Sequence, residues 1–520
     1  MKKQIYRCII LIGLLSSCGT SGNKENPTDK FSNQYVLNRT YIGEITPKNS
    51  KNIAGSFWGI QAGSNREDIL AKASEIGVKW TRLSAAWPDI EKQKGVYDFS
   101  ATDTAFEAAL KNGITPFVYL GRGHPEYTGY AEYDDPQLAA VYGRHLKPPI
   151  YSEEHMEAFL RYIRAVIERY KDKIEYWEIW NEPNHHSYWG AVPDGKEYGK
   201  LLKRTAELIR SIDPDCKIIG GAMAGIDPVF TDDFLNQGTA RLIDIISFHN
   251  YGAVPEERIY KAVEFLEVIE KHNPNIVVWQ GECGYPSHSS TRDYRGRAPW
   301  GLNIQAKWLL RQSFVDTYFC KAKLSNYFIL ANFGNREDIR ERTGLRDIDK
   351  VLGYPERGGS RVRTWGVNEK CLLSNPDLKE KPAFFAYQNL CAIWDATYEP
   401  CSLDNKIRIN SEGAFYGIKW DDAFPSLPLL ASYRAENGNL LFAWWLPWNM
   451  QEFIAEYADI ELFVSGASMK EPVLVDLLEG KIYPIDTYEK LADGMTFKNL
   501  PLADFPFIIC EKEALGVYRK

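Results

Sequence analysis

IEYWEIWNEPN, residues 174–184, is the stretch that decides the fold. Aromatic and β-branched residues fill its first part, as in a β-strand, and a Glu-Pro turn stops that strand. Amphipathic helical stretches flank it, and after Ser152 the apolar residues Phe159, Ile163 and Val166 recur at helical spacing. Further β-rich runs alternate with helical stretches in the same way, at 52–60, 78–87, 114–121, 217–225, 243–251, 276–283 and 325–333.

The chain thus contains eight successive units of a strand followed by a helix, as a closed (β/α)8 TIM barrel does, and we expect this barrel over residues 53–395. An open, doubly wound sheet is the competing fold, but it usually has a glycine-rich phosphate turn after its first strand, and this chain has none. The long segments of the barrel all follow strands, at 122–151, 184–195, 286–301 and 334–380. We therefore expect them on the C-terminal face, where such barrels carry their functional sites.

Both ends of the chain lie outside this repeat. Beyond residue 396, short segments of alternating hydrophobicity predict a C-terminal antiparallel β-sandwich as an accessory domain over 396–520. We expect residues 33–52 to form one or two N-terminal strands that join the same sandwich. The predicted fold class is thus α/β, with one (β/α)8 barrel and one small β-domain.

The N-terminus has the pattern of an export signal. Basic residues precede a short apolar run, residues 8–15, which is too short to span a bilayer. The run leads into Leu-Ser-Ser-Cys, which resembles a bacterial lipobox that ends at Cys18. We expect a lipoprotein signal peptide over 1–18, lipidation of Cys18 and a flexible tether over 19–32, with an ordinary signal peptide as the alternative. We therefore expect the lipid on Cys18 to be what attaches the protein to a membrane of the bacterial cell envelope, with the outer membrane favoured.

Composition narrows the possible functions. The net charge of −7 and the lack of a long basic run argue against nucleic-acid binding. The cysteines beyond Cys18 are widely spaced and form no zinc-type cluster with histidine, so we expect no metal site, and we find no cofactor motif. Aromatic residues make up 13% of the chain, which suits a surface that stacks on sugar rings. A carbohydrate is therefore the expected partner.

Two glutamates end predicted strands that face each other across the barrel. Glu182 closes the fourth strand and Glu282 closes the seventh, so their side chains can converge over the barrel mouth. Glycosidic cleavage needs such a pair, because one carboxyl group protonates the leaving oxygen while the other attacks the sugar or activates water. Either glutamate alone is explained as well by a solvated loop position, but their joint placement favours a glycosidase.

The Trp-Asn-Glu-Pro-Asn motif within residues 175–184 resembles that of glycoside hydrolase family 39, and the barrel as a whole resembles the clan A retaining glycoside hydrolases. The resemblance implies that Glu182 is the general acid/base and Glu282 the nucleophile, acting on β-linked sugars by double displacement. It also implies binding or supporting roles for residues at other strand ends, namely Arg82, His124, Asn181, His249 and Tyr251. In this comparison Asn181 bonds the sugar 2-hydroxyl and Tyr251 donates to Glu282, and the His-x-Tyr pattern is also similar to family 5.

One position departs from the clan pattern. Many clan members place a tryptophan on strand eight beneath the sugar, whereas residues 325–333 contain none. We expect the sugar floor to come from Trp300 or Trp365 instead, or to be absent. Trp189 and Trp300 are expected to stack on the substrate, although loop packing would explain them as well. The loops after strands three and seven also carry basic residues that would suit a uronate or sulfate, or else form a solvated face, namely Arg144, His145, Lys147, Arg292, Arg295 and Arg297.

Two further functions compete with a retaining glycosidase. A non-catalytic, surface glycan-binding lipoprotein would use the barrel as a scaffold, but such a decayed site should have lost one carboxylate, and both are present. A transglycosylase would use the same two glutamates and pass the sugar to an acceptor other than water. The wording of the motif names neither the sugar nor its linkage.

Overall fold

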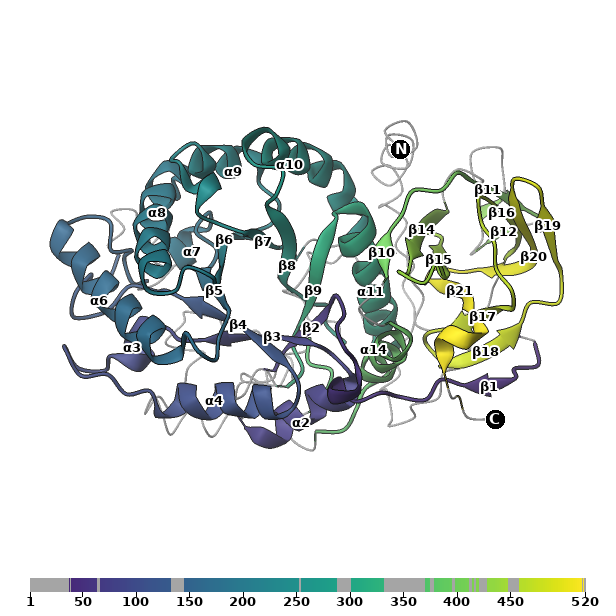
Figure 1. Cartoon of the computed structure of the whole chain (residues 1–520), viewed down its shortest axis with the longest axis horizontal. Coiled ribbons are helices and arrows are strands. Elements are labelled where there is room, and N and C mark those ends of the chain that lie inside the picture. The colour runs from purple at the N-terminus through teal and green to yellow at the C-terminus, as the bar shows by residue number, and fades with distance from the viewer. Residues whose placement is uncertain are drawn as a thin grey trace, which may run out of the picture.

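The computed structural model describes residues 37, 39–62, 66–131, 145–251, 254–287, 301–331, 370–374, 378–394, 398–410, 428–447, 458–516 and 518, and the backbone of 414–415 and 418–419. It contains a closed parallel β-barrel next to antiparallel sheets (Figure 1). This arrangement confirms the fold class predicted from the alternating β and α runs.

The barrel consists of eight parallel strands in sequence order, and β9 pairs with β2 to close the ring. Their bounds are β2 (Trp58–Gln61), β3 (Trp80–Ser84), β4 (Thr115–Leu120), β5 (Tyr176–Ile179), β6 (Lys217–Ala224), β7 (Ile245–His249), β8 (Val277–Cys283) and β9 (Ala322–Phe328). The fourth and seventh barrel strands are thus β5 and β8, which precede or carry the two glutamates.

Helices surround the barrel, and most of them bury one face, whereas α11 is buried along nearly its whole length. The longer ones are α2 (Glu67–Ile76), α4 (Ser100–Lys111), α6 (Glu153–Tyr170), α8 (Gly195–Ile212), α9 (Pro228–Leu235), α10 (Arg258–His272), α11 (Leu302–Phe314) and α14 (Pro382–Ile393). Shorter turns are η1 (Ser50–Asn52), α3 (Trp87–Ile90), α7 (His186–Trp189), η2 (Thr239–Arg241), η3 (Pro255–Glu257), η4 (Val315–Phe319) and η6 (Lys512–Leu515). Helix α6 shows the sequence logic, because Ser152 caps its first turn by accepting from the backbone of His155 at 3.1 Å, and Phe159 and Ile163 are fully buried.

The lower part of the barrel interior is apolar. Side chains from several strands fill it, namely Phe117, Ile219, Ile245, Trp279 and Leu324, with Trp80 and Tyr176 packed against them. Polar side chains that are also buried lie further along the same strands, toward their C-terminal ends, and they include Arg82 and Glu178. The barrel interior is therefore a packed core, with charged side chains in the layer at the C-terminal ends of the strands.

The remaining strands form the accessory sheets. A seven-stranded sheet runs in the order β1 (Gly43–Glu44), β18 (Lys481–Pro484), β17 (Pro472–Asp476), β21 (Phe507–Glu511), β15 (Leu440–Trp445), β14 (Leu429–Arg434) and β10 (Glu399–Pro400). A four-stranded sheet runs in the order β11 (Asn405–Ile409), β16 (Ala458–Ser465), β20 (Gly494–Leu502) and β19 (Tyr488–Leu491), and β12 (Ala414–Phe415) pairs with β13 (Ile418–Lys419). Strand β1 brings the N-terminal part of the described chain into this region, since Gly43 pairs with Ile482.

Buried ion pairs join the accessory sheets to the barrel along α11, which lies between them in Figure 1. The Lys307 ammonium donates to both oxygens of Asp504 at 2.9 and 3.0 Å, and each side chain is at most 1% exposed. One turn further along, Arg311 makes a two-pronged bond to Glu256 at 2.7 Å, and Glu256 also accepts from the Trp445 indole. Within the described ranges, no helix is long and apolar enough to cross a membrane.

Candidate active site

The two glutamates reach the barrel mouth from opposite strands. Glu282 is part of β8, whereas Glu182 follows β5 after a turn with left-handed backbone at Trp180 (φ 71°) and at Glu182 itself (φ 47°). The backbone N–H of Glu182 donates to the carbonyl of Ala222 on β6 at 2.8 Å, which fixes this turn against the next strand. A non-glycine residue in this conformation is held there by its surroundings, and such positions often occur at functional sites.

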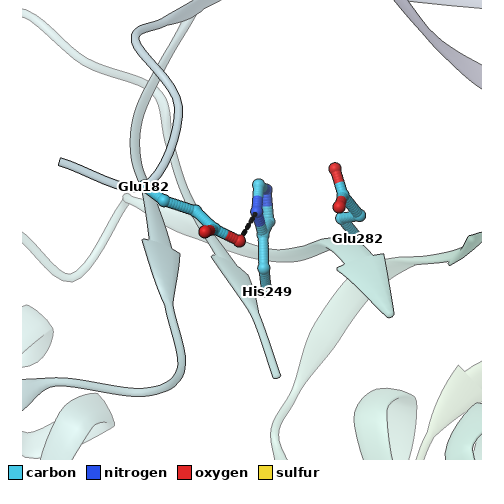
Figure 2. A group of neighbouring side chains, drawn as sticks. All are labelled: Glu182, His249 and Glu282. Carbon is cyan, nitrogen blue, oxygen red and sulfur yellow. Dashed lines mark hydrogen bonds and ion pairs between the residues drawn. The ribbon is translucent and has the colours of Figure 1, made fainter. Parts of the chain in front are cut away.

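Glu182 and Glu282 lie within reach of one substrate bond. One carboxylate oxygen of each, and one ring nitrogen of His249, all lie within 4.8 Å of one another. Figure 2 shows the Glu182 side chain directed toward His249, with Glu282 on the other side of that ring. Glu182 is 7% exposed, and the side chain of Glu282 is 14% exposed, so both are largely sheltered from water. The predicted convergence of the two carboxylates is present in the structure.

Arg82 on β3 organises the group around Glu282. Its Nη1 donates to Glu282 at 2.8 Å, its Nη2 donates to the amide oxygen of Asn181 at 2.9 Å, and its Nε donates to Glu178 at 2.6 Å. Burial opposes the charge of Arg82, but Glu178 and Glu282 outweigh it and raise the pKa of the guanidinium above its usual value. Arg82 is therefore a fixed cation that contacts three of the polar groups at the mouth.

Tyr251 and His249 hold one glutamate each. The Tyr251 hydroxyl donates to Oε1 of Glu282 at 2.5 Å, and His249 Nδ1 lies 3.1 Å from Oε1 of Glu182. Burial, followed by the negative charge of Glu282, raises the pKa of Tyr251 well above its usual value, so its hydroxyl keeps the proton that it donates. Both oxygens of Glu282 thus accept a hydrogen bond.

Glu178 is a third carboxylate in this group, and the sequence analysis missed it. It is fully buried on β5, where it accepts from Arg82 and, at 2.5 Å, from the hydroxyl of Ser247 on β7. Period-two alternation was the signal that could have found it, because Tyr176 and Glu178 share the inward face of β5. Gly281 leaves room beside it, since a Cβ there would lie 3.3 Å from Glu178, Ser247 and His249.

Not every predicted binding residue faces the mouth. His124 is 2% exposed, and both of its ring nitrogens contact backbone, at the carbonyl of Glu91 (2.6 Å) and the N–H of Glu126 (3.2 Å). Its ring also packs on Trp87. In this structure His124 thus supports the loop after β4.

The expectation for Trp189 needs a correction. We expected this tryptophan to stack on the substrate, but it is fully buried at the end of the short helix α7, against the rings of Trp180 and Tyr198. A side chain without exposed surface cannot contact a sugar, so Trp189 supports the turn that carries Glu182. Trp300, Trp365 and Cys18 lie outside the described residues, as do Arg144, Arg292, Arg295 and Arg297.

Two other aromatic side chains lie at the mouth. Phe328 ends β9, the eighth barrel strand, and its partly exposed ring lies 6.0 Å, centre to centre, from the ring of Tyr251. Tyr188 on α7 is 48% exposed, and partial desolvation together with the charges of Glu182 and Glu282 raises its pKa to about 12. Neither residue was predicted from the sequence as the sugar floor, which we expected from Trp300 or Trp365.

Glu182, His249 and Glu282 also have the spacing of three metal ligands. However, each oxygen of Glu282 already accepts a hydrogen bond from Arg82 or Tyr251, and the guanidinium is itself a cation at this position. The donor set therefore fits a carboxylate held by a cation better than a resident metal ion.

Comparisons with known proteins show which proteins this chain resembles. The sequence profile of Glycosyl hydrolases family 39 matches residues 76–273, a segment that includes Arg82, Glu182 and Tyr251 but ends before Glu282. A β-xylosidase of Geobacillus stearothermophilus is 27% identical over 165 residues, which is 31% of this chain and 32% of that protein. A 6-phospho-β-glucosidase of Clostridium longisporum is 32% identical over 196 residues, or 32% of this chain and 36% of the relative. The matches thus span about a third of the length of these curated relatives.

Solved structures extend the likeness to most of the fold. A family 39 glycoside hydrolase from the gut symbiont Bacteroides cellulosilyticus WH2 superposes with a TM-score of 0.58 at 16% identity, over 90% of this chain and 83% of that one. A monomeric β-xylosidase from Caulobacter crescentus CB15 gives a TM-score of 0.52 at 17% identity, over 90% and 98% of the two chains. The profile match makes residues 76–273 of this chain similar to family 39 of the glycosyl hydrolases, and the solved structures share its fold over most of the remaining chain.

Proposed function

We propose that this protein hydrolyses β-glycosidic bonds with retention of configuration, with Glu182 as general acid/base and Glu282 as nucleophile. The observation that carries the proposal is that one carboxylate oxygen of Glu182 and one of Glu282 lie within 4.8 Å of each other across the barrel mouth. Retaining enzymes hold their carboxyl groups about 5–5.5 Å apart, whereas inverting enzymes leave about 6.5–9.5 Å for a water molecule. This close approach matches the shorter spacing better, which favours direct attack by Glu282.

The contacts of Glu282 suit a nucleophile. Arg82 and Tyr251 donate to its two oxygens and thereby fix the orientation of the carboxylate. A carboxylate that is already in attack geometry avoids part of the entropic cost of the reaction. Asn181, held at its amide oxygen by Arg82, keeps its NH2 group available for a sugar hydroxyl.

The position of Glu182 suits proton transfer in both half-reactions. Glu182 first gives its proton to the leaving oxygen while Glu282 forms a bond to the anomeric carbon. In the second half-reaction Glu182 takes a proton from the water that attacks the glycosyl ester, and Glu282 leaves as a carboxylate. His249, 3.1 Å from Glu182, holds the side chain on the line between strands β5 and β8.

The names of relatives suggest which substrates to try first. Two of the matched proteins are β-xylosidases and one is a 6-phospho-β-glucosidase. We therefore infer that aryl β-xylosides and β-glucosides are suitable first substrates, with the sugar resting on the partly exposed ring of Phe328. An apolar ring face is a suitable floor for the C–H side of a pyranose.

Activity measurements on active-site variants test the assignment. Glu182→Gln and Glu282→Gln should each lose roughly 10³-fold or more in kcat/KM on an unactivated β-glycoside. Azide should restore turnover to Glu182→Ala on an activated aryl glycoside and give a β-glycosyl azide, because the small anion attacks the anomeric carbon of the glycosyl ester without needing a base, and Glu282 leaves as a carboxylate. Glu256→Gln, which alters another buried carboxylate that pairs with Arg311 instead of Arg82, is the matched control for folding.

Proton NMR of the first product formed completes the test. A β-anomer confirms retention, whereas an α-anomer would contradict the roles given to both glutamates. Wild-type protein that binds oligosaccharides without cleaving them would favour the glycan-binding alternative. Transfer to added acceptor sugars in preference to water would favour the transglycosylase.

We also propose that lipid at Cys18 anchors the protein to a bacterial outer membrane. The support is the sequence pattern described above, in which a short apolar run leads into Leu-Ser-Ser-Cys. In a bacterial host, labelled fatty acid should appear on the full-length protein and be lost from Cys18→Ser. Equal labelling of both forms, or of neither, would contradict lipidation at this residue.

A further inference from the structure

Basic side chains gather on the Glu182 side of the barrel mouth. Arg122 comes two residues after β4 ends and is exposed, with left-handed backbone (φ 68°). His185 is exposed at the start of α7, and its backbone N–H donates to the carbonyl of Glu182 at 2.9 Å. These two residues therefore flank the acid/base glutamate from neighbouring strand ends.

The segment 145–147 brings a third basic residue, His145, to the same place. A Cβ on Gly123 would lie 1.9 Å from the carbonyl oxygen of Lys147, and a Cβ on Gly190 would lie 2.2 Å from that of Leu146. The segment is thus in close backbone contact both with the turn after β4 and with the turn that ends α7. Only glycine permits this approach, so the loop sequence itself positions His145.

Arg122 gives the cluster a positive charge, and His145 and His185 add imidazole groups beside it. Within the part of the chain that the structure describes, no ion pair joins Arg122, His145 or His185 to a carboxylate. Burial, and then the neighbouring His185 and Arg122, lower the pKa of His145. The Nε2 atom of His145 is buried and has no hydrogen-bond partner among the described groups. Grouped basic side chains repel one another, which is unfavourable unless an anion joins them.

Tyr188 links this cluster to the catalytic pair. Its pKa is raised by desolvation, Glu182 and Glu282 and lowered by Arg122 and Arg82, so its hydroxyl lies within the influence of all four charges. The ring of His185 packs on Tyr188 at 5.5 Å. A sugar seated against Tyr188 beside Glu182 would therefore present its substituents to the basic cluster.

We propose that Arg122, His145 and His185 form a subsite for an acidic group, a carboxylate or a sulfate, on the sugar bound beside Glu182. The inference rests on the proposed function and names the substrate class of the same site. A guanidinium matches the two oxygens of a carboxylate or sulfate, and the imidazole N–H groups supply further donors. The negative charge of the nucleophile Glu282 repels an anion in the cleft, so the cluster supplies the compensating attraction.

Matched pairs of aryl glycosides test the subsite. The first pair compares 4-nitrophenyl β-glucuronide with the β-glucoside, and its sulfate arm uses the β-glucoside 6-sulfate. The second pair keeps one neutral sugar and compares a 3-carboxy-4-nitrophenyl with a 4-nitrophenyl leaving group. We expect wild type to favour the acidic member of at least one pair, and Arg122→Gln to lower that preference about ten- to a hundredfold in kcat/KM.

Controls separate this inference from the proposed function. Arg122→Lys should keep part of the preference, and Arg164→Gln, an exposed arginine on α6, should keep all of it. Hydrolysis of neutral glycosides that is lost in Glu282→Gln supports the proposed function, whatever the acidic preference. If wild type shows no acidic preference, or Arg122→Gln lowers both members of each pair equally, the subsite is wrong.

If the protein hydrolyses none of these glycosides, the proposed function fails. A binding measurement can still test the subsite. Calorimetry of the Glu282→Gln variant with a glucuronate-containing disaccharide and its neutral counterpart then decides the subsite alone. Tighter binding of the acidic sugar that Arg122→Gln abolishes would support it. Equal binding of the two sugars, or tighter acidic binding that survives Arg122→Gln, would overturn it.

Discussion

Glu178 is the residue whose contacts explain most about the site and whose role the sequence did not reveal. It accepts from Arg82 Nε at 2.6 Å and from Ser247 at 2.5 Å, so it fixes the guanidinium that reaches Glu282. Glu178→Gln should lower kcat/KM about ten- to a hundredfold, because an amide cannot hold both donors in the same way. The acid limb of the kcat/KM profile should also move to lower pH. Without the negative charge of Glu178, Arg82 stabilises the remaining carboxylate, Glu282, more strongly.

A second buried pair separates this positioning role from stability alone. Glu256 accepts two bonds from Arg311 and is 3% exposed, much like Glu178. Breaking either pair should cost about 3–5 kcal/mol of unfolding free energy. Thermal unfolding should therefore shift in both Glu178→Gln and Glu256→Gln, whereas only Glu178→Gln should change the pH profile. An unchanged profile in Glu178→Gln would reduce Glu178 to a structural residue.

Tyr251 allows a prediction about alkaline pH. Burial and the charge of Glu282 raise its pKa well above the usual value near 10, so Tyr251 stays protonated as pH rises through the working range. Loss of its proton therefore does not cause the alkaline limb of the activity profile. Tyr251→Phe should lower kcat roughly tenfold or more and leave the alkaline limb where it is in wild type. A limb that disappears in this variant would show that Tyr251 titrates within the range.

At the scale of elements, the aromatic residue that ends β9, Phe328, lies partly exposed at the mouth, whereas the one that ends α7, Trp189, is buried. Phe328→Ala should raise KM for aryl glycosides about tenfold with little change in unfolding free energy, because its ring is partly exposed at the mouth. Trp189→Phe should instead lower the unfolding free energy by about 1–3 kcal/mol, because its ring is fully buried. Steady-state kinetics with denaturant unfolding of both variants checks this, and a KM effect confined to Trp189→Phe would restore the original expectation.

The helices and strands could be predicted from the sequence where their apolar residues recur at a regular spacing. Alternating strands and capped helices, such as α6 after Ser152, predicted the eight-stranded barrel, and strand-end placement predicted the convergence of Glu182 and Glu282. The burial of Trp189 was not predictable, because α7 has four residues and too few positions to show a helical period. Glu178 was missed because a charged residue within a strand gives no sign of whether its partner is a cation or water.

At the scale of the whole molecule, the accessory sheets and the barrel share a buried polar interface. Lys307 and Asp504 are almost fully enclosed, so removing either one leaves an uncompensated charge. Asp504→Leu and Lys307→Met should each cost about 3–5 kcal/mol, whereas the double variant should recover much of that loss. Denaturant unfolding of the four proteins gives the coupling. Purely additive losses would show that the pair does not act as a unit.

Strand β1 has a consequence for the order in which the molecule is built. Glu44 pairs with Lys481, so the earliest strand in the described chain lies in a sheet whose other members come from its last third. During synthesis that strand leaves the ribosome long before its neighbour exists, while each barrel strand can meet the next one soon after it is made. Among the described strands, the first to be translated is therefore one of the last to be placed, because it can pair only after β18 has been made.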